Sequence, residues 1–238
     1  MDLRRFGELF AELSRTPADD LGSVGTRLCV ACVELLDVGD AGILLVDDDG
    51  GVSCFATSGP SAVGVMEDLQ FTLGEGPGLD AHASGRPIFA PDLAGSDVAP
   101  WSAFAPAALG RGLQGVFSFP LRADSVRLGA LDLSRATPGA LSRQQGLDGV
   151  AMAEVVTRRL LAAQLGAPDG LLGADLDDPG TLRIEVHQAT GMISEQLDIR
   201  TADALVLLRA AAYASERLID DLAHDVVGRR VRFDDHQT

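Results

Sequence analysis

Apolar side chains near the start of the chain recur every three or four residues. This spacing over residues 21–36 predicts an amphipathic helix, whose apolar members are Leu21, Val24, Leu28, Ala31, Cys32 and Leu35. Two short apolar runs follow, at 41–46 and 52–56, on either side of the Asp- and Gly-rich residues 47–51. A strand, a turn and a second strand in this order predict a β-hairpin.

A second pair of strands is expected further along the chain. Residues 115–121 and 126–133 are rich in apolar side chains, and the turn residues 123–125 separate them. Between the two pairs, residues 59–106 are rich in Gly and Pro and include an extended piece at 87–90. These patterns predict an α+β domain with a central antiparallel sheet.

A long helix with two apolar faces is predicted over residues 142–165. One face carries Leu147, Val150, Ala151 and Val155, and a neighbouring face carries Met152, Val156, Leu160 and Ala163. An apolar stripe this wide indicates that the helix has two partners. We expect one face to cover the sheet and the second face to contact another copy of the chain, which predicts a homodimer. A predicted N-terminal helix at 1–19 would contribute to the same contact.

The C-terminal part of the sequence indicates a separate all-α three-helix domain. Gly, Pro and Asp dominate residues 166–180, which predicts a linker. Helices are expected at about 182–197, from the N-cap Thr201 onward, and around 218–227. Their predicted inward residues are Ile184, Ala189, Met192, Ile193, Leu197, Leu205, Leu208, Ala212, Leu218, Leu222, Ala223, Val226 and Val227. The predicted domains are therefore 20–165, which includes the stalk helix, and 181–238.

Charge restricts the classes of partner. The 238 residues include 35 acidic and 19 basic side chains, every basic one an Arg, for a formal net charge of −16. This charge opposes binding to anionic membranes and non-specific binding to nucleic acid, but it permits a local site built from Arg. Residues 179–238 hold 10 acidic residues and 7 Arg, and Arg229, Arg230 and Arg232 are the densest positive cluster. Because no apolar run reaches the roughly 18 residues of a membrane span and three cysteines cannot all pair, we expect a cytoplasmic protein.

The sequence contains no recognisable catalytic or metal-binding motif. Cys29 and Cys32 form a C-x-x-C inside an apolar helix, where two small core residues are the favoured interpretation. The Gly-rich residues 74–78 lack the spacing of a dinucleotide fingerprint and the Lys of a P-loop. They predict a turn that opens a helix, with a ligand lid as the alternative, because Gly allows close approach of backbone to a ligand. The sequence requires no cofactor, and we expect no enzymatic activity.

Three motifs occur together in the C-terminal part. They are A-x-G-M at 189–192, A-x-x-x-L-R-x-x-A at 204–212, and Leu-Ala at 222–223 followed by Val-Val at 226–227. With them, this part resembles the ANTAR domain, the RNA-binding three-helix module of bacterial antitermination regulators. The resemblance implies binding to a pair of RNA hairpins with hexanucleotide loops, which prevents a terminator from forming. Thr190 stands where this family often carries Lys.

A second resemblance covers residues 20–164. It is carried by 41–46, 74–81, 115–121 and 128–133, which are similar to a GAF domain, a sensory α+β fold. Gly78 stands where related sequences often have Cys. The resemblance implies a domain that binds a small molecule in some members and none in others. Together the two parts resemble the GAF–ANTAR regulators of actinobacteria.

Candidate RNA contacts lie on the first two helices of the C-terminal domain: Gln188, Ala189, Thr190, Gly191, Arg209 and Tyr213. Proteins read RNA specifically in loops, where splayed bases can meet a helix edge. Gly191 would let a loop approach the backbone, while Arg209 would contact a phosphate and Tyr213 would stack on a base. The alternatives are a salt bridge within the domain for Arg209 and close helix packing for Gly191. The whole module could also dock on a protein partner without touching RNA.

A ligand pocket is expected in the first domain if that domain binds a small molecule. Its predicted walls are Gly74, Gly76, Asp80, Phe117 and Leu131, which combine the Gly-rich turn with two strands of the sheet. A sheet face filled by side chains would instead favour a role in dimerisation.

Overall fold

The computed structural model describes residues 21–47, 52–59, 62–95, 101–166, 181–215 and 217–233, with side chains placed throughout these ranges except at 21–23, 62–63, 163–166 and 181–184. The described residues fall into two compact units. We call those between 21 and 166 the N-terminal unit and those between 181 and 233 the C-terminal unit. The helix predicted at 1–19 and residues 167–180 of the predicted linker lie outside the described residues.

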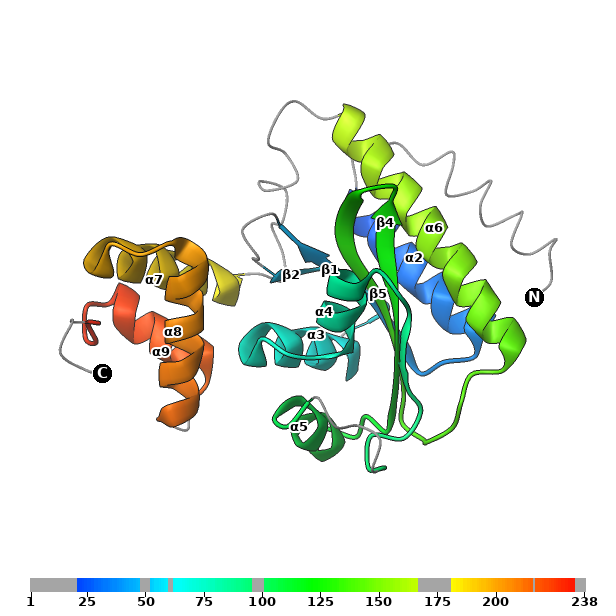
Figure 1. The fold of residues 1–238 in the computed structure, drawn as a ribbon, viewed down its shortest axis with the longest axis horizontal. Coiled ribbons are helices and arrows are strands. Elements are labelled where there is room, and N and C mark those ends of the chain that lie inside the picture. The colour runs from blue at the N-terminus through cyan, green and yellow to red at the C-terminus, as the bar shows by residue number, and fades with distance from the viewer. Residues whose placement is uncertain are drawn as a thin grey trace. The chain divides into compact units, whose positions relative to one another are not determined.

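Five antiparallel strands form the sheet of the N-terminal unit, in the order β2-β1-β5-β4-β3 (Figure 1). Their bounds are β1 Asp40–Val46, β2 Val52–Thr57, β3 Ile88–Ala90, β4 Gly115–Ala123 and β5 Val126–Arg135. Both predicted strand pairs are confirmed. The central strand β5 approaches β1 so closely that a Cβ at Gly129 would collide with the Leu44 carbonyl. Gly129 also has a φ of 156°, which an L side chain rarely adopts.

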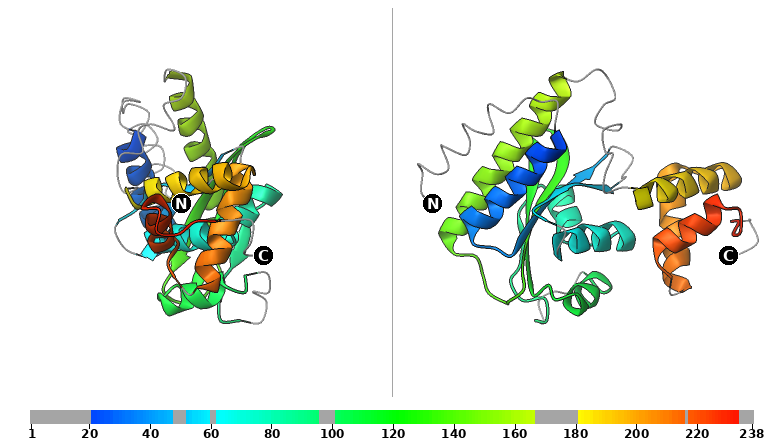
Figure 2. Two further views of the ribbon diagram at one scale, coloured as in Figure 1. Left: turned by 90° about the vertical axis from the view of Figure 1, so that its left-hand side faces the viewer. Right: turned by 180° about the vertical axis from the view of Figure 1, so that it is seen from behind.

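Two helices cover one face of the sheet: α2 (Leu21–Leu36) and α6 (Arg143–Gly166) (Figures 1 and 2). They bury an apolar core against strands β4 and β5 that includes Leu28, Leu36, Phe117, Phe119, Leu131, Leu133, Met152 and Val156. Cys29 and Cys32 are fully buried free thiols in this core, and burial raises the pKa of Cys32 to about 12. The interpretation of both cysteines as core residues is therefore confirmed.

The two apolar faces of α6 are used differently from the prediction. Met152, Val156 and Leu160, expected to meet a second copy of the chain, are buried in the core below α6. Leu147 and Val150 instead remain 57% and 43% exposed. The side chain of Ala163 lies outside the described residues. Both faces satisfy the same helical spacing, so spacing could not decide which one meets the sheet.

The opposite face of the sheet carries three shorter helices. These are α3 (Ala62–Leu73), α4 (Pro77–Ser84) and α5 (Phe104–Gly110) (Figure 1). A second apolar cluster lies among them and includes Met66, Leu69, Trp101, Phe104, Ala108 and Val116. The predicted helix opening in the Gly-rich turn is confirmed, since α4 begins at Pro77 after Gly76.

The C-terminal unit consists of α7 (Thr181–Leu197), α8 (Thr201–Ala214) and α9 (Ile219–Val227). Its core is built from Val186, Ala189, Ile193, Ala204, Leu208, Ala212, Ile219, Leu222, Ala223 and Val226. Leu218, expected in this core, is the N-cap of α9 and is mostly exposed, while its neighbour Ile219 is buried. Among the described residues, no helix is long and apolar enough to cross a membrane.

Two glycines on α6 give a matched test of this packing. A Cβ at Gly149 would collide with the buried Phe119 ring, whereas a Cβ at Gly146 would meet open space. We expect Gly149→Ala to destabilise the N-terminal unit by about 1–2 kcal/mol, because overpacking outweighs the gain in helix propensity. Gly146→Ala should instead stabilise this unit by about 0.5 kcal/mol. Urea unfolding of the full chain measures both, and equal effects of the two substitutions would contradict this packing.

Candidate functional site

The five residues predicted to wall a pocket do not lie on one side of the sheet. Phe117 and Leu131 belong to the core beneath α2 and α6, whereas the Gly-rich turn belongs to the other face. Side chains alternate between the two faces along a strand. The residues of β4 and β5 that face α3 and α4 are therefore their neighbours Ser118 and Asp132, which pair with each other across the ladder. The five predicted residues therefore cannot wall a single pocket, because the sheet separates Phe117 and Leu131 from the Gly-rich turn.

A buried polar cluster occupies this other face. Gln70 of α3 donates its amide hydrogen to Asp132 Oδ2 at 2.7 Å and accepts the Gly78 backbone N–H at 2.7 Å. Gln70, Ser118 and Asp132 are fully buried. A Cβ at Gly78 would collide with the Asp132 carboxylate, and one at Gly76 would collide with Gln70. The two glycines are therefore required because α4 lies directly against these polar groups.

Burial dominates the electrostatics of the cluster. Desolvation raises the pKa of Asp132 to about 6, although the Ser118 hydroxyl and the Gln70 amide oppose the rise. A second carboxylate, Glu67, is also fully buried on α3. The sequence patterns did not predict this cluster. The available signal was Asp132 between two leucines in the apolar stretch 128–133, since a buried charge is rare without partners.

Two carboxylates, one in the Gly-rich turn and one in the first turn of α4, hold neighbouring structure in place. Asp80 Oδ2 accepts the Trp101 indole N–H at 2.9 Å. Glu75 Oε1 accepts the backbone N–H groups of Ala103 and Phe104 at 2.7 and 2.8 Å, where α5 begins. A carboxylate at these first N–H groups of a helix satisfies donors that have no partner within the helix. The turn therefore links α4 to α5 above the cluster.

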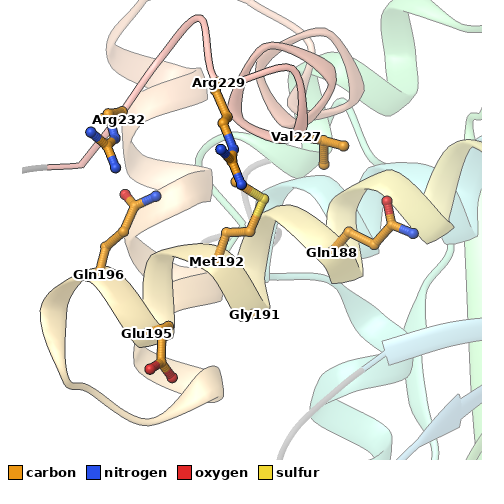
Figure 3. A pocket seen from close by; sticks show the side chains of 8 residues that line it. All are labelled: Gln188, Gly191, Met192, Glu195, Gln196, Val227, Arg229 and Arg232. Atoms are coloured by element: carbon orange, nitrogen blue, oxygen red, sulfur yellow. The ribbon is translucent and has the colours of Figure 1, made fainter.

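A groove of about 610 Å³ lies in the C-terminal unit (Figure 3). It is lined by Gln188, Gly191, Met192, Glu195 and Gln196 of α7, by Val227 of α9, and by Arg229 and Arg232 of the following segment. Two of the predicted RNA-contact residues, Gln188 and Gly191, therefore meet two residues of the Arg-rich tail. Within the described residues, neither Arg229 nor Arg232 has an ion pair.

The other predicted contact residues lie elsewhere. Ala189 and Thr190 are buried, and the Thr190 hydroxyl donates to the Val186 carbonyl at 2.7 Å, so neither side chain reaches the surface. Tyr213 on α8 is 73% exposed. Arg209, also on α8, is partly buried, and desolvation lowers its pKa to about 10. None of these four residues lines the groove.

Gly191 has no packing role in the described structure. It lies in the interior of α7, where Gly is less favourable than Ala by about 1 kcal/mol. A Cβ built on Gly191 meets no atom within 4 Å, which rules out the alternative of close helix packing. The absence of a side chain instead keeps the floor of the groove open.

Arg229 adopts a backbone conformation that normally requires Gly. Its φ is 56°, in the left-handed region that costs other residues roughly 1–2 kcal/mol. Helix α9 is capped by Gly228, which has an ordinary φ of −71°, so the left-handed position falls one residue later, on Arg229. This conformation accompanies the turn that directs Arg229 across α7 (Figure 3).

The segment after α9 is held in place by charged and polar contacts. Arg230 Nε and Arg217 Nη2 both contact the Asp225 carboxylate, each at 2.6 Å. The Phe233 backbone N–H donates to Gln196 Oε1 at 3.1 Å. Arg230 therefore fixes the segment, while Arg229 and Arg232 line the groove.

Two residues with an unfavourable backbone free energy thus line one groove. They are Gly191, in the interior of a helix, and Arg229, in the left-handed conformation. Native proteins retain such costs where function needs them. Among the described residues, no group of three or more His, Cys, Asp or Glu side chains could hold a metal ion. The groove contains two arginines and a helix backbone left open at Gly191. It is therefore the candidate site for an anionic partner.

Comparisons with known proteins concern the N-terminal unit. The family model described as GAF domain matches residues 18–147. The GAF domain of a phosphoenolpyruvate-protein phosphotransferase from Coxiella burnetii is 19% identical, with a TM-score of 0.56, over 69% of this chain and 95% of that chain. The corresponding domain from Acinetobacter is 14% identical, with a TM-score of 0.52, over 71% of this chain and 98% of that chain.

An enzyme is similar at the same level. The free methionine-R-sulfoxide reductase from Neisseria meningitidis, solved with its substrate, is 17% identical with a TM-score of 0.51, over 68% of this chain and 89% of that chain. Identities this low show a shared fold and do not establish a shared activity. No curated protein matches the chain.

The buried carboxylate makes stability depend on pH in a defined direction. Because the folded state raises the pKa of Asp132 from about 3.8 to about 6, its contribution is fully present below pH 4 and is lost as pH rises through 6. The expected loss is at most about 3 kcal/mol. Asp132→Asn removes the ionisation and keeps an acceptor for Gln70. We expect its unfolding free energy, relative to the natural sequence, to be clearly higher at pH 8 than at pH 5. A difference that stays constant across this range would contradict the assignment.

Proposed function

The chain belongs to the GAF domain family through residues 18–147, and from this premise we propose that it is a signal-responsive transcription antitermination regulator. GAF domains are commonly ligand-sensing or signalling modules. The sensory N-terminal unit controls the C-terminal unit, which binds paired RNA hairpins and prevents a terminator from forming. In this proposal the protein is not an enzyme. The RNA step comes from the resemblance of the C-terminal motifs and from the groove.

The observation that carries the RNA-binding proposal is the meeting of Gly191 with Arg229 and Arg232. A nucleotide in an RNA loop presents a phosphate and an unstacked base together. The two guanidinium groups neutralise phosphate, and the open surface at Gly191 lets the loop approach the α7 backbone. Gln188 is exposed beside Gly191 and offers an amide that can donate to and accept from a base edge.

The charge of the C-terminal unit limits how strongly its RNA binding depends on salt concentration. Glu195 also lines the groove, so the local excess of positive charge is small. We therefore expect a shallow salt dependence, equivalent to about two to four neutralised phosphates per C-terminal unit. Specificity then depends on loop shape and base contacts more than on phosphate contacts.

The proposed signal enters on the face of the sheet that carries the Asp132 cluster. The other face is filled by the core beneath α2 and α6. A small molecule that binds between α4 and the sheet has to displace the Gly78–Gln70 contact, because α4 lies directly against the cluster. Binding would therefore move α4 and, through Glu75 and Asp80, the start of α5.

Docking on a protein partner without RNA is the second candidate function. It is favoured by the acidic balance of residues 179–238, which limits phosphate neutralisation. RNA binding is preferred because the groove offers two arginines and an open helix backbone in one place.

Gly191→Ala and Arg229→Gly separate stability from RNA binding. Each removes a local backbone cost, so each should stabilise the C-terminal unit by about 0.5–1 kcal/mol. Each should also weaken RNA binding by about ten-fold, the first by obstructing the groove and the second by removing a cation. Fluorescence anisotropy with a two-hairpin RNA of hexanucleotide loops measures affinity, and urea unfolding measures stability.

Matched controls lie in the N-terminal unit. Gly146→Ala is the same change at another helical Gly with open space around it, and Arg158→Ala removes an exposed Arg from α6. Both should leave RNA affinity unchanged. Stabilised groove variants with undiminished RNA affinity would favour the protein-docking function instead.

A further inference from the structure

Helix α8 presents an apolar stripe to solvent. Val206, Leu207 and Tyr213 are 59%, 38% and 73% exposed, and Ala210 and Ala214 are exposed between and beside them. The inward side of the same helix is already buried in the core through Ala204, Leu205, Leu208 and Ala212. The stripe therefore takes no part in the buried core of the C-terminal unit. Nothing in the described part of that unit covers it.

A small side chain, Ala210, lies at the centre of the stripe. Residues three and four apart are neighbours on a helix surface, so Val206 and Leu207 lie one turn before Ala210, and Tyr213 and Ala214 lie one turn after it. A small residue between larger ones allows a second helix to approach closely at that point, as knobs fit into holes.

We propose that α8 pairs antiparallel with α8 of a second copy of this chain, about a two-fold axis at Ala210. In that arrangement, a residue at a given number of positions before Ala210 lies level with the residue at the same number after it in the second copy. Val206 then faces the small Ala214 of the second copy, and Leu207 faces its Tyr213. Each contact occurs twice, as two-fold symmetry requires.

Charge at the ends of the stripe agrees with this register. Asp203 lies in the first turn of α8, and Arg217 follows the end of the same helix, two residues after its C-cap Ser215. Antiparallel pairing brings the start of one α8 to the end of the other, so opposite charges come near each other at both ends of the pair. Asp203 is bound to Arg200 and its side chain is still 49% exposed. Arg217 is bound to Asp225, a carboxylate that Arg230 also contacts. Antiparallel helices also place their dipoles in a favourable orientation.

The stripe suits a protein surface better than RNA. It carries no cation of its own, and RNA affinity depends largely on phosphate neutralisation. No residue of α8 lines the groove, so pairing through α8 leaves that groove free. A pair of chains then presents two grooves, one for each hairpin of a two-hairpin RNA. This last consequence rests on the proposed function, whereas the pairing itself does not.

Disulfide cross-linking of the full chain tests the register without RNA. Two copies of Ala210→Cys meet at the axis, within the separation of roughly 4.4–6.8 Å between Cα atoms that a disulfide requires. The matched control is Ala214→Cys, which is also exposed on α8. Its two copies lie about 12 Å apart along the paired helices, beyond that limit. Cys29 and Cys32 are buried and Cys54 is half-buried. Cross-linking of the natural sequence therefore measures the background from these three cysteines.

We expect about ten-fold more cross-linked dimer with Ala210→Cys than with Ala214→Cys after mild oxidation. Adding Val206→Arg to Ala210→Cys should abolish the cross-link while leaving far-ultraviolet circular dichroism unchanged, because Val206 is a surface residue. Equal cross-linking of the two cysteine variants, or cross-linking no greater than that of the natural sequence, would overturn the proposal.

A second measurement separates this inference from the proposed function. Val206→Arg should keep the affinity for a single-hairpin RNA and lose the preference for a two-hairpin RNA, because the second loop no longer binds at high effective concentration. A protein that cross-links through Ala210→Cys but binds neither RNA would retain the pairing and contradict the RNA-binding function. A two-hairpin preference that survives Val206→Arg would count against the pairing.

Discussion

One buried, hydrogen-bonded carboxylate organises a whole face of the N-terminal unit. Asp132 lies in the central strand β5, accepts a hydrogen bond from Gln70 of α3, and is approached by α4 at Gly78. A carboxyl group is kept in a dry interior only when donors reach it, so α3 has to supply its amide at this point of the sheet. The other end of the same amide accepts the Gly78 N–H and fixes the start of α4. The glycines at 76 and 78 follow from this arrangement, because the space for their side chains is already occupied by polar atoms.

In the C-terminal unit, by contrast, two residues are unfavourable for the local backbone at their own positions. Gly191 and Arg229 are both poor choices for the backbone they adopt, and within the described residues no packing contact accounts for Gly191. They are far apart in sequence, and only the return of the chain after α9 brings them together. Asp225 and Gln196 hold that return segment by one carboxylate and one amide. The side of the groove that this segment forms therefore depends on a few polar contacts, whereas α7 and α9 are held by the apolar core.

The surfaces of the C-terminal unit differ in chemistry in a way that suits two kinds of partner. The groove combines arginines, amides and an open helix backbone, which are groups that bind phosphate and base edges. The outer side of α8 is apolar with charges only at its ends, as is typical of a helix that meets another helix. The proposed recognition of paired hairpins would use both, one surface to bind each loop and one to bring two binding units together.

The sequence by itself determined most elements of this protein, although its patterns did not locate helices α3 and α5. Short apolar runs separated by turn residues were enough for β1, β2, β4 and β5, and helical spacing was enough for α2, α6 and the three C-terminal helices, because these patterns are local. The core role of Cys29 and Cys32 followed from their apolar helix. Tertiary structure decided which side of each element meets which neighbour. Alternation assigns Phe117 and Ser118 to opposite faces of the sheet but does not say which face lies beneath α4, and both faces of α6 satisfied the same spacing. The burial of Thr190 depends on which side of α7 packs into the three-helix core. The left-handed conformation of Arg229 and its meeting with Gly191 depend on where α9 ends and how the chain turns back. Both are decided by contacts between segments distant in sequence.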